Sequence, residues 1–373
     1  MVIQYKCPNC GADMKYDSKS GKLYCDSCKT TKDISQMPLP EIPEGESEDT
    51  PDVTAFSPTE IEEEVSFDYP KEAVASKLFD SQAVNHYHCQ NCGADLLTDK
   101  DTAATTCSFC GAAVVLGDRL SGELAPAKVI PFRISKEEAQ TAFQKWCKKG
   151  LLIPHEFQIS NRLKSITGIY VPFWLYDISA KGEVDATCTR VRTYTRGNYI
   201  YTETSYFHVY RRVNINYLKV PADASAKMND TLMDRLEPFH YQELKDFNMP
   251  YLAGYLAEKY NYTDDQMFSR AKGRVDRYAN QYIAGTINGY STVHYNRKNL
   301  SIQPRNAYYT LMPVWMVCYD YHDSEHIFAM NGQTGKIVGK PPLSKSKMAV
   351  WFIGISGILF ALMQLVTRLF LWT

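Results

Sequence analysis

The amino-acid sequence predicts an α+β protein in which two small four-cysteine ribbons precede a larger α+β domain and one apolar helix follows it. Three observations support this fold class. Eight of the eleven cysteines form Cys-x-x-Cys pairs, strand and helix signals alternate through the middle of the chain, and the last stretch is apolar. The predicted segments are a first ribbon at 1–36, an acidic disordered linker at 37–70, a short helix and second ribbon at 71–120, an α+β domain at 121–345 and a terminal helix at 346–373.

The cysteine-rich part contains an internal repeat. Cys-Pro-Asn-Cys-Gly-Ala-Asp at 7–13 matches Cys-Gln-Asn-Cys-Gly-Ala-Asp at 89–95, and a second Cys-x-x-Cys pair follows each copy after the same interval. The chain starts with no charged segment before an apolar run, so we expect no signal peptide. In a reducing compartment, such cysteine pairs are typical of metal sites rather than of disulfides.

Four thiolates on two tight turns are a ligand set that suits a structural zinc ion. Glycine after Cys10, Cys92 and Cys110 allows the backbone to curl so that its amides face the sulfurs. Redox-active pairs are the alternative, but they require a helix N-terminus in thioredoxin-like surroundings, which the sequence does not indicate. We therefore predict two structural zinc ions, each with four protein ligands. The predicted ligands are Cys7, Cys10, Cys25, Cys28, Cys89, Cys92, Cys107 and Cys110.

The segment between the two ribbons is acidic. Residues 38–69 are rich in Glu, Pro and Ser and contain neither Lys nor Arg. Such a composition buries too little apolar surface to offset the entropy of ordering, which predicts an extended linker. A short helix is expected after it, near 71–79.

Two helices in the larger domain are predicted from capping boxes. Ser135 with Glu138 opens a helix that continues to about Lys148, and Thr263 with Gln266 opens another. We expect the second helix to end near residue 283.

The segments around these helices favour strands. Residues 128–134 and a run from 170 to about 220 have strand-like composition, and Pro-x-Trp occurs in such a segment twice, at 172–174 and 313–315. This echo predicts that 125–342 could consist of two repeats of one α+β unit.

The C-terminal stretch has the length and composition of a membrane anchor. Residues 348–367 include no charged side chain, and twenty helical residues span about 30 Å, the thickness of the hydrocarbon layer. A buried core helix is the alternative. Four lysines precede the stretch and Arg368 follows it, so the positive-inside rule predicts a single-pass cell-membrane protein with cytoplasmic N-terminal domains. These lysines are Lys336, Lys340, Lys345 and Lys347.

Several other motifs have a structural interpretation that we favour. His322 to His326 matches the H-x-x-E-H pattern of inverted zinc proteases, but its flanks favour a β-hairpin, as do those of 331–336. We expect a solvated face for the basic residues of the helix at 264–283. We treat two histidines before the second ribbon as bystanders and three isolated cysteines as small buried hydrophobes. These residues are His86, His88, Cys147, Cys188 and Cys318.

Taken together, the chain resembles the bacterial membrane proteins described as TFIIB-type zinc-ribbon-containing proteins. The resemblance rests on the double ribbon, the strands at 170–174 and 312–315, and the turn at 328–336 before the membrane segment. It covers nearly the whole chain and implies the same eight cysteine ligands. The family is also similar to proteins encoded beside flotillin-like (SPFH) and phage-shock-type membrane stress proteins, which implies a membrane-recruiting adaptor.

Three functions from different classes remain open. The first is a non-enzymatic, membrane-anchored adaptor whose partners are membrane proteins, SPFH or flotillin-like proteins among them. The second is a nucleic-acid-binding protein, for which the six lysines of the first ribbon speak, although the net charge of −1 offers no overall basic field. The third is an enzyme in the α+β domain, for which no defensible catalytic residue is visible. Gly357 and Ala361 hint at a homo-oligomer through the anchor.

Overall fold

The computed structural model describes residues 2–37, 85–93, 95–98, 101–107, 110, 112–117, 125–150, 152–154, 163–321 and 324–371. Within these ranges the chain forms four α-helices, which are α1 (Lys136–Lys148), α3 (Asp230–Leu236), α4 (Asp264–Thr286) and α5 (Lys345–Leu371). The predicted short helix at 71–79 and the linker, apart from Met37, lie outside the described residues. A mixed α+β class is confirmed, as are two four-cysteine groups and a long apolar C-terminal helix.

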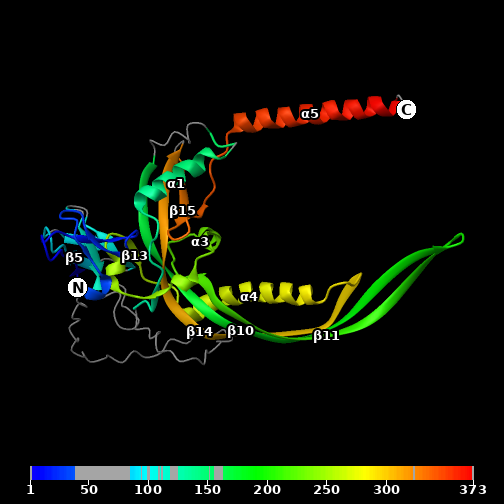
Figure 1. Cartoon of the computed structure of the whole chain (residues 1–373), viewed down its shortest axis with the longest axis horizontal. Coiled ribbons are helices and arrows are strands. Elements are labelled where there is room, and N and C mark those ends of the chain that lie inside the picture. Colours follow the sequence, from blue (N-terminus) through cyan, green and yellow to red (C-terminus); the bar gives the residue numbers. More distant parts are fainter. Residues whose placement is uncertain are drawn as a thin grey trace, which may run out of the picture.

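Most strands belong to one 11-stranded sheet, ordered β1-β8-β7-β13-β10-β14-β15-β16 with β11 beside β10 and β9 between β14 and β12 (Figure 1). Its strands are β1 (Val2–Ile3), β7 (Thr102–Thr106), β8 (Ala113–Leu116), β9 (Lys128–Val129), β10 (Leu163–Arg196), β11 (Tyr199–Asp223), β12 (Lys245–Asp246), β13 (Leu256–Glu258), β14 (Thr292–Tyr321), β15 (Ser324–Asn331) and β16 (Ile337–Val338). Smaller sheets contain β2 (Met14–Asp17), β3 (Lys22–Cys25) and β4 (Thr31–Lys32), and β5 (Asn85–His88) and β6 (Asp95–Thr98).

The sheet joins the cysteine-rich part to the larger domain. β1 of the first ribbon pairs with β8 of the second, and β7 of the second ribbon pairs with β13 of the domain. The first ribbon also contacts the domain directly, because the Tyr16 amide donates to the Ala253 carbonyl over 2.9 Å and the Tyr16 ring packs on Tyr251. The ribbons are therefore integral parts of one sheet and not freely tethered units.

The antiparallel pair β10 and β14 forms the centre of the domain. Pro172 of β10 and Pro313 of β14 lie in these central strands, where proline normally removes a ladder hydrogen bond. The carbonyl of each proline accepts from an amide on the outer side, Ala224 at 3.0 Å and Gly332 at 2.9 Å. On that side each proline lies in the gap where one neighbouring strand ends and another begins, so its missing N–H leaves no strand without a partner.

The two Pro-x-Trp motifs make matching contacts. The Trp174 indole donates to the Tyr262 carbonyl over 2.8 Å, and the Trp315 indole donates to the Ile134 carbonyl over 3.1 Å. Tyr262 and Ile134 each directly precede the N-cap residue of a helix. Both predicted capping boxes are confirmed, and each indole therefore anchors the start of one capped helix to the central strands.

The strand that precedes each helix also takes a matching position. β9 precedes α1 and pairs in parallel with β14 at Thr310 and Leu311. β13 precedes α4 and pairs in parallel with β10 at Ile169 and Tyr170, which are the same number of residues before Trp174 as 310 and 311 are before Trp315. Each strand thus joins the opposite half. β9 is shorter than the strand expected at 128–134, because Pro131 has no amide hydrogen for the ladder and the amides of Arg133 and Ile134 donate to the Gly332 carbonyl instead.

A long curved arm extends from the domain (Figure 1). β10, β11 and β14 continue together beyond the core, and α4 covers one face through Ile283 and Ile287, which pack on Val184, Ala186 and Cys188. β14 begins at Thr292 opposite Thr189, so only β10 and β11 continue beyond that point. We call residues 190–205, a two-stranded hairpin closed at Gly197 and Asn198, the β-arm.

Helix α5 projects away from the domain (Figure 1). Its Lys345–Gln364 part is long and apolar enough to cross a bilayer, and none of the window assessed is buried. Hydrogen bonds from Ser344 to Leu152 and from Lys347 to Ile153 hold the start of α5 to the domain. A core helix would be covered by the protein, so exposure on all sides favours a lipid environment.

Candidate metal centres and their surroundings

The first four-cysteine site lies in the hairpin of β2 and β3 and the turns around it. Cys7 Sγ is 3.5 Å from Cys28 Sγ, and Cys10 Sγ is 3.5 Å from Cys25 Sγ. One sulfur from each Cys-x-x-Cys pair therefore lies beside a sulfur from the other pair. The hairpin brings the pairs together because Met14 and Cys25 are opposite each other at its open end.

The second site repeats this arrangement. Cys89 Sγ is 3.7 Å from Cys110 Sγ, and Cys92 Sγ is 3.7 Å from Cys107 Sγ. The structure thus brings all eight predicted ligands together in two groups, and within each group the four sulfurs lie within 4.8 Å of one another.

The sulfur spacing fits a tetrahedral metal ion. Four sulfurs at about 2.3 Å from one ion lie about 3.8 Å apart, close to the distances observed in both groups. Each group could therefore hold one metal ion with a complete set of four ligands. A complete ligand set indicates a structural role for the metal, since a catalytic ion keeps one position for water or substrate.

The backbone conformation of the Cys-x-x-Cys turns brings their sulfurs together. The residue after the second cysteine is left-handed in Gly11 (φ 73°), Gly93 (φ 72°) and also Lys29 (φ 64°). The Gly11 amide donates to the Cys7 carbonyl, and the Lys29 amide donates to the Cys25 carbonyl. Glycine adopts this conformation without strain, which explains the sequence signal at 11 and 93. Lys29 has the same role without glycine, so the pattern in the sequence missed it.

Neighbouring polar groups favour the thiolate form of two outer ligands. Thr30 Oγ1 lies 3.1 Å from Cys28 Sγ, and this hydrogen bond lowers the pKa of Cys28 to about 6. In the second site a hydrogen bond with the Asn91 side chain lowers the pKa of Cys110 to about 6. A thiolate is the form that binds a metal ion, so both contacts prepare their site for a cation.

Within each site the cysteine ligands differ in solvent exposure. Cys7, Cys25, Cys89 and Cys107 are buried, whereas Cys10, Cys92 and Cys110 are exposed. One rim of each site therefore faces solvent, and the opposite side is part of the packed interior. Solvent-facing knuckles on a fixed base are surfaces that another protein could contact.

Direct contacts connect the two ribbons. The Gln90 side chain donates to the Val2 carbonyl over 2.8 Å, and the Gln4 amide nitrogen lies 3.6 Å from Cys89 Sγ. Lys6 Nζ donates to Asn91 Oδ1 over 2.9 Å. The ligands of one site are thus held partly by residues of the other ribbon.

The basic residues of the first ribbon are largely engaged. Lys6 pairs with Asp13 at 2.5 Å, Lys15 with Asp26 at 3.3 Å and Lys19 with Glu138 at 3.5 Å. Half of the six lysines therefore have a carboxylate partner, although Lys15 and Lys19 stay exposed to solvent. This arrangement weakens the case for a phosphate-binding ribbon.

The remaining candidates lie apart from the metal groups. Cys147 and Cys188 are buried, as predicted, while the side chain of Cys318 and the whole of His322 lie outside the described residues. The predicted hairpin around the H-x-x-E-H pattern is present, with His326 of β15 opposite Tyr319 of β14. The turn at 331–336 also joins two strands, as expected, because β15 pairs with β16.

The prediction of a solvated face on α4 was wrong for two arginines. Arg274 is 8% exposed and donates to the Pro221 carbonyl over 3.1 Å, to Glu237 over 2.6 Å and to Asp234. Arg270 pairs with Asp230 at 3.0 Å. These carboxylates lie on or just after α3, spaced about one helical turn apart, and that periodicity is the signal that could have revealed the cluster.

A buried carboxyl group lies at the end of β11, close to this cluster. Asp223 is 1% exposed, its Oδ1 accepts from the Ser225 amide over 3.1 Å, and its Oδ2 has no hydrogen-bond partner. Burial raises the pKa of Asp223 to about 7, despite the opposing hydrogen bond. Asn331 has the matching position at the end of β15, where its Oδ1 accepts from the Gln333 amide over 2.9 Å.

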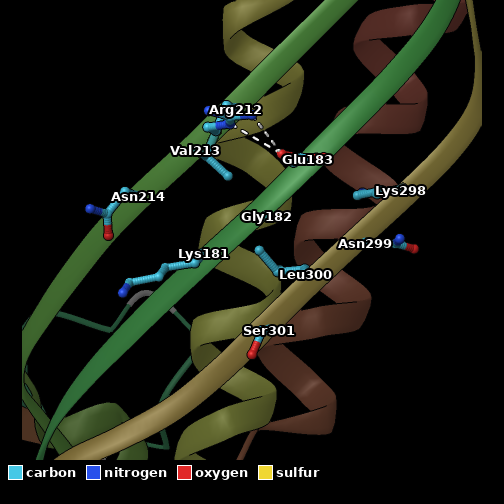
Figure 2. Close-up of a pocket in the computed structure, with 10 residues that line it drawn as sticks. All are labelled: Lys181, Gly182, Glu183, Arg212, Val213, Asn214, Lys298, Asn299, Leu300 and Ser301. Carbon is cyan, nitrogen blue, oxygen red and sulfur yellow. Dashed lines mark hydrogen bonds and ion pairs between the residues drawn. The ribbon is translucent and has the colours of Figure 1, made fainter.

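A shallow hollow of 830 Å³ lies on the three-stranded part of the arm around Gly182 (Figure 2). Figure 2 shows its side chains on three adjacent strands, with Arg212 turned toward Glu183. These two side chains form an ion pair at 3.0 Å, so their charges neutralise each other. The hollow offers no pair of groups suited to acid–base or nucleophilic chemistry.

The chain is similar to a Bacillus subtilis (strain 168) protein described as "Uncharacterized protein YdjG". The two are 51% identical over 367 residues, which cover 98% of each chain. No family model matches the chain. No solved structure matches it either. The similarity extends over the ribbons, the domain and the apolar helix, rather than over one segment.

Proposed function

The chain belongs to the same family as the Bacillus subtilis protein YdjG, and we propose that it is a non-enzymatic, membrane-anchored zinc-ribbon adaptor. In this proposal the ribbons dock protein partners at the cytoplasmic face of the cell membrane, and α5 anchors the chain in the bilayer. The observation that carries the proposal is the combination of two complete four-thiolate sites, in ribbons joined to the main sheet, with an apolar helix that the described residues leave uncovered.

The metal in both sites is proposed to be zinc. Zinc imposes no geometry of its own and accepts four thiolates in a tetrahedron, and in a reducing compartment it adds no redox chemistry. The two ions would stiffen the turns at Cys10, Cys92 and Cys110, whose exposed side faces solvent. Rigid, exposed turns favour docking because little conformational entropy is lost on binding.

The membrane orientation is proposed from the charges that flank α5. Lys336, Lys340, Lys345 and Lys347 precede the apolar stretch, which places the ribbons on the cytoplasmic side under the positive-inside rule. The resemblance to TFIIB-type zinc-ribbon membrane proteins supports the same orientation. It also suggests SPFH or flotillin-like membrane proteins as partners, in a response to membrane stress.

Nucleic-acid binding, linked to transcription or replication, remains the alternative function. The ion pairs of the first-ribbon lysines count against it, since they reduce the charge available to phosphates. A titration of the protein with labelled DNA at rising salt separates the two proposals. A steep loss of affinity with salt supports the alternative, and no binding at low salt removes it.

We further propose that the α+β domain arose by internal duplication. The matching contacts of Trp174 and Trp315, of Pro172 and Pro313, and of β13 and β9 support this origin. β9 of the first half pairs with β14 of the second, and β13 of the second half pairs with β10 of the first. The two repeats would therefore form one folding unit.

Affinity purification of the tagged full-length chain from nuclease-treated, detergent-solubilised membranes tests the adaptor function. We expect membrane proteins to be enriched with the wild type and lost with Cys89→Ser/Cys92→Ser. The matched control, Cys147→Ser, replaces a buried thiol outside both sites and should retain the partners. Recovery of the chain in the soluble fraction, or partners drawn instead from the polymerase or replication machinery, would contradict the proposal.

A further inference from the structure

We propose that the β-arm is a contact element for an anionic bilayer surface, so that the protein touches the membrane at a second point besides α5. The proposal rests on the membrane anchoring proposed above. It assigns a ligand chemistry, phosphate headgroups together with the interfacial layer, to a hairpin that contacts the rest of the described chain only at its base, through Arg190 and Val191.

The β-arm is exposed along its whole length. Every residue from 190 to 206 is exposed, although the two strands are fully paired with each other. Isolated two-stranded hairpins are marginally stable in water, so an arm of this length gains from a surface that covers one side. Tyr199 and Ile200, at the tip, are 70% and 74% exposed.

One face of the β-arm combines cations with aromatic rings. Alternation along β10 places Arg190, Arg192, Tyr194 and Arg196 on the face that α4 covers further back, since Val184, Ala186 and Cys188 lie on that face. Across the hairpin, Tyr201 stacks on Tyr194 with ring centroids 5.6 Å apart.

Two of the three arginines on this face, Arg192 and Arg196, are available to a ligand. The β-arm contains three arginines and one acidic residue, Glu203. Arg190 is held by the Gly289 carbonyl and by the ring of Phe207. Arg192 and Arg196 form no ion pair within the part of the chain that the structure describes, and the Arg192 guanidinium lies 6.0 Å from the Tyr194 ring centroid.

Arginine beside tyrosine is the composition expected at a membrane interface. Tyrosine prefers headgroup depth because its ring is apolar and its hydroxyl is polar. Basic side chains are attracted to the anionic lipids of the cytoplasmic leaflet. The β-arm contains both residue types at its tip, in alternation with threonine, whereas a core-facing hairpin would alternate polar with aliphatic residues.

The position of the β-arm sets a condition on membrane contact. In Figure 1 the arm and α5 extend from the domain toward the same side. A two-stranded hairpin has unpaired backbone groups on its edges and cannot enter the hydrocarbon, so the arm must lie at headgroup depth. Contact of the arm with the leaflet therefore requires α5 to turn relative to the domain, which breaks the hydrogen bonds that join Ser344 and Lys347 to the Leu152 and Ile153 carbonyls.

Hydrogen exchange of the full-length chain in lipid nanodiscs tests this contact. One set of discs contains phosphatidylcholine alone, and in the other about a third of the lipid is phosphatidylglycerol, to mimic the anionic leaflet. We expect amides of residues 190–206 to exchange about tenfold or more slowly in the anionic discs, while those of α4 stay unchanged. Equal exchange of the β-arm in both discs overturns the proposal.

Charge variants show whether the arginines cause the effect. Each arginine near an anionic leaflet strengthens contact about fivefold, so Arg192→Gln/Arg196→Gln should weaken it about 25-fold and restore the exchange seen in zwitterionic discs. The matched control, Lys272→Gln/Arg277→Gln, removes two exposed charges from α4 and should leave the protection intact. Protection that survives the β-arm variant overturns the proposal.

Two further measurements separate the competing outcomes. Flotation of the full-length chain with phosphatidylcholine vesicles reports α5 insertion alone. Failure to float contradicts the proposed anchoring, whereas flotation without β-arm protection contradicts only the β-arm contact. Addition of duplex DNA to the zwitterionic discs tests whether the β-arm binds nucleic-acid phosphates instead of lipid phosphates. Protection of the β-arm by DNA but not by anionic lipid overturns the membrane assignment.

Discussion

At the scale of single residues, the molecule depends on a few polar groups placed where the backbone needs them. Lys29 adopts the left-handed turn that glycine supplies at 11 and 93, and Thr30 next to it stabilises a thiolate. Asp223 and Asn331 close matching strand ends, one with a carboxyl and the other with an amide. The amide of Asn331 also donates to the Leu236 carbonyl over 3.0 Å, while Asp223 Oδ2 has no partner.

The carboxyl of Asp223 predicts a pH-dependent stability. Its folded pKa of about 7 lies above the unfolded value of about 3.9, so the native state holds a proton that the unfolded state has lost. This group therefore makes the protein most stable at the acidic end, and stability falls as pH rises toward 7. Asp223→Asn should remove the loss and add about 2–4 kcal/mol at pH 8.

Denaturant unfolding of the full-length chain in detergent, followed by tryptophan fluorescence at several pH values, measures this effect. Asp276→Asn on α4, where the carboxylate is exposed, is the control and should change little. A pH profile of Asp223→Asn identical to that of the wild type would refute the assignment.

The metal ligands predict a stoichiometry. Cys25→Ser should lower the bound metal from two ions per chain to one, because three thiolates hold zinc much more weakly than four. Cys147→Ser changes a thiol in the core and should retain both ions. Metal analysis of the purified proteins decides between the outcomes, and loss of metal from the Cys147 variant as well would argue against two local sites.

At the scale of elements, two indole hydrogen bonds fix where the capped helices α1 and α4 begin. Each capped helix starts beside the indole of the opposite half, since Trp174 binds the carbonyl before α4 and Trp315 binds the carbonyl before α1. Each of the two tryptophans also packs on an aromatic ring that lies just before its helix. Trp174 packs on Tyr260 at 5.3 Å and Trp315 on Phe132 at 5.0 Å.

If the two halves are equivalent, the two indoles should contribute alike. Trp174→Phe and Trp315→Phe each leave a backbone carbonyl without its donor and should each cost about 1–3 kcal/mol of unfolding free energy. Trp146→Phe is the control, because that indole makes ring contacts with Phe143 and Phe328 and should cost less. Denaturant titrations of the three variants would disprove the equivalence if one of the first two proved neutral.

At the scale of the whole molecule, one sheet connects the ribbons with the domain. β1 pairs with β8, and β7 pairs with β13. Backbone hydrogen bonds therefore couple the folding of the two metal sites to the folding of the domain. The ribbons are therefore joined to the domain through paired strands. The arm and α5 project from that same domain (Figure 1).

This coupling predicts that metal removal weakens the domain as well. A chelator should lower the unfolding midpoint reported by Trp174 and Trp315, since loss of ribbon structure leaves β13 without β7 on one edge. Thermal unfolding of the full-length chain with and without chelator, and after zinc is restored, measures the effect. An unfolding midpoint that stays the same with and without metal would show that the ribbons and the domain are energetically independent.

Features that depend on local chemistry could be predicted from the amino-acid sequence alone. Cysteine spacing predicted both four-thiolate groups, the capping boxes predicted where α1 and α4 begin, and apolar length predicted α5, because each rests on residues close together in the chain. Three other features follow from the three-dimensional packing. β9 and β13 cross to the opposite half, Arg274 is buried against Glu237, and both ribbons contribute strands to the main sheet. These depend on pairing between residues far apart in sequence, where packing and hydrogen-bond satisfaction outweigh local preference.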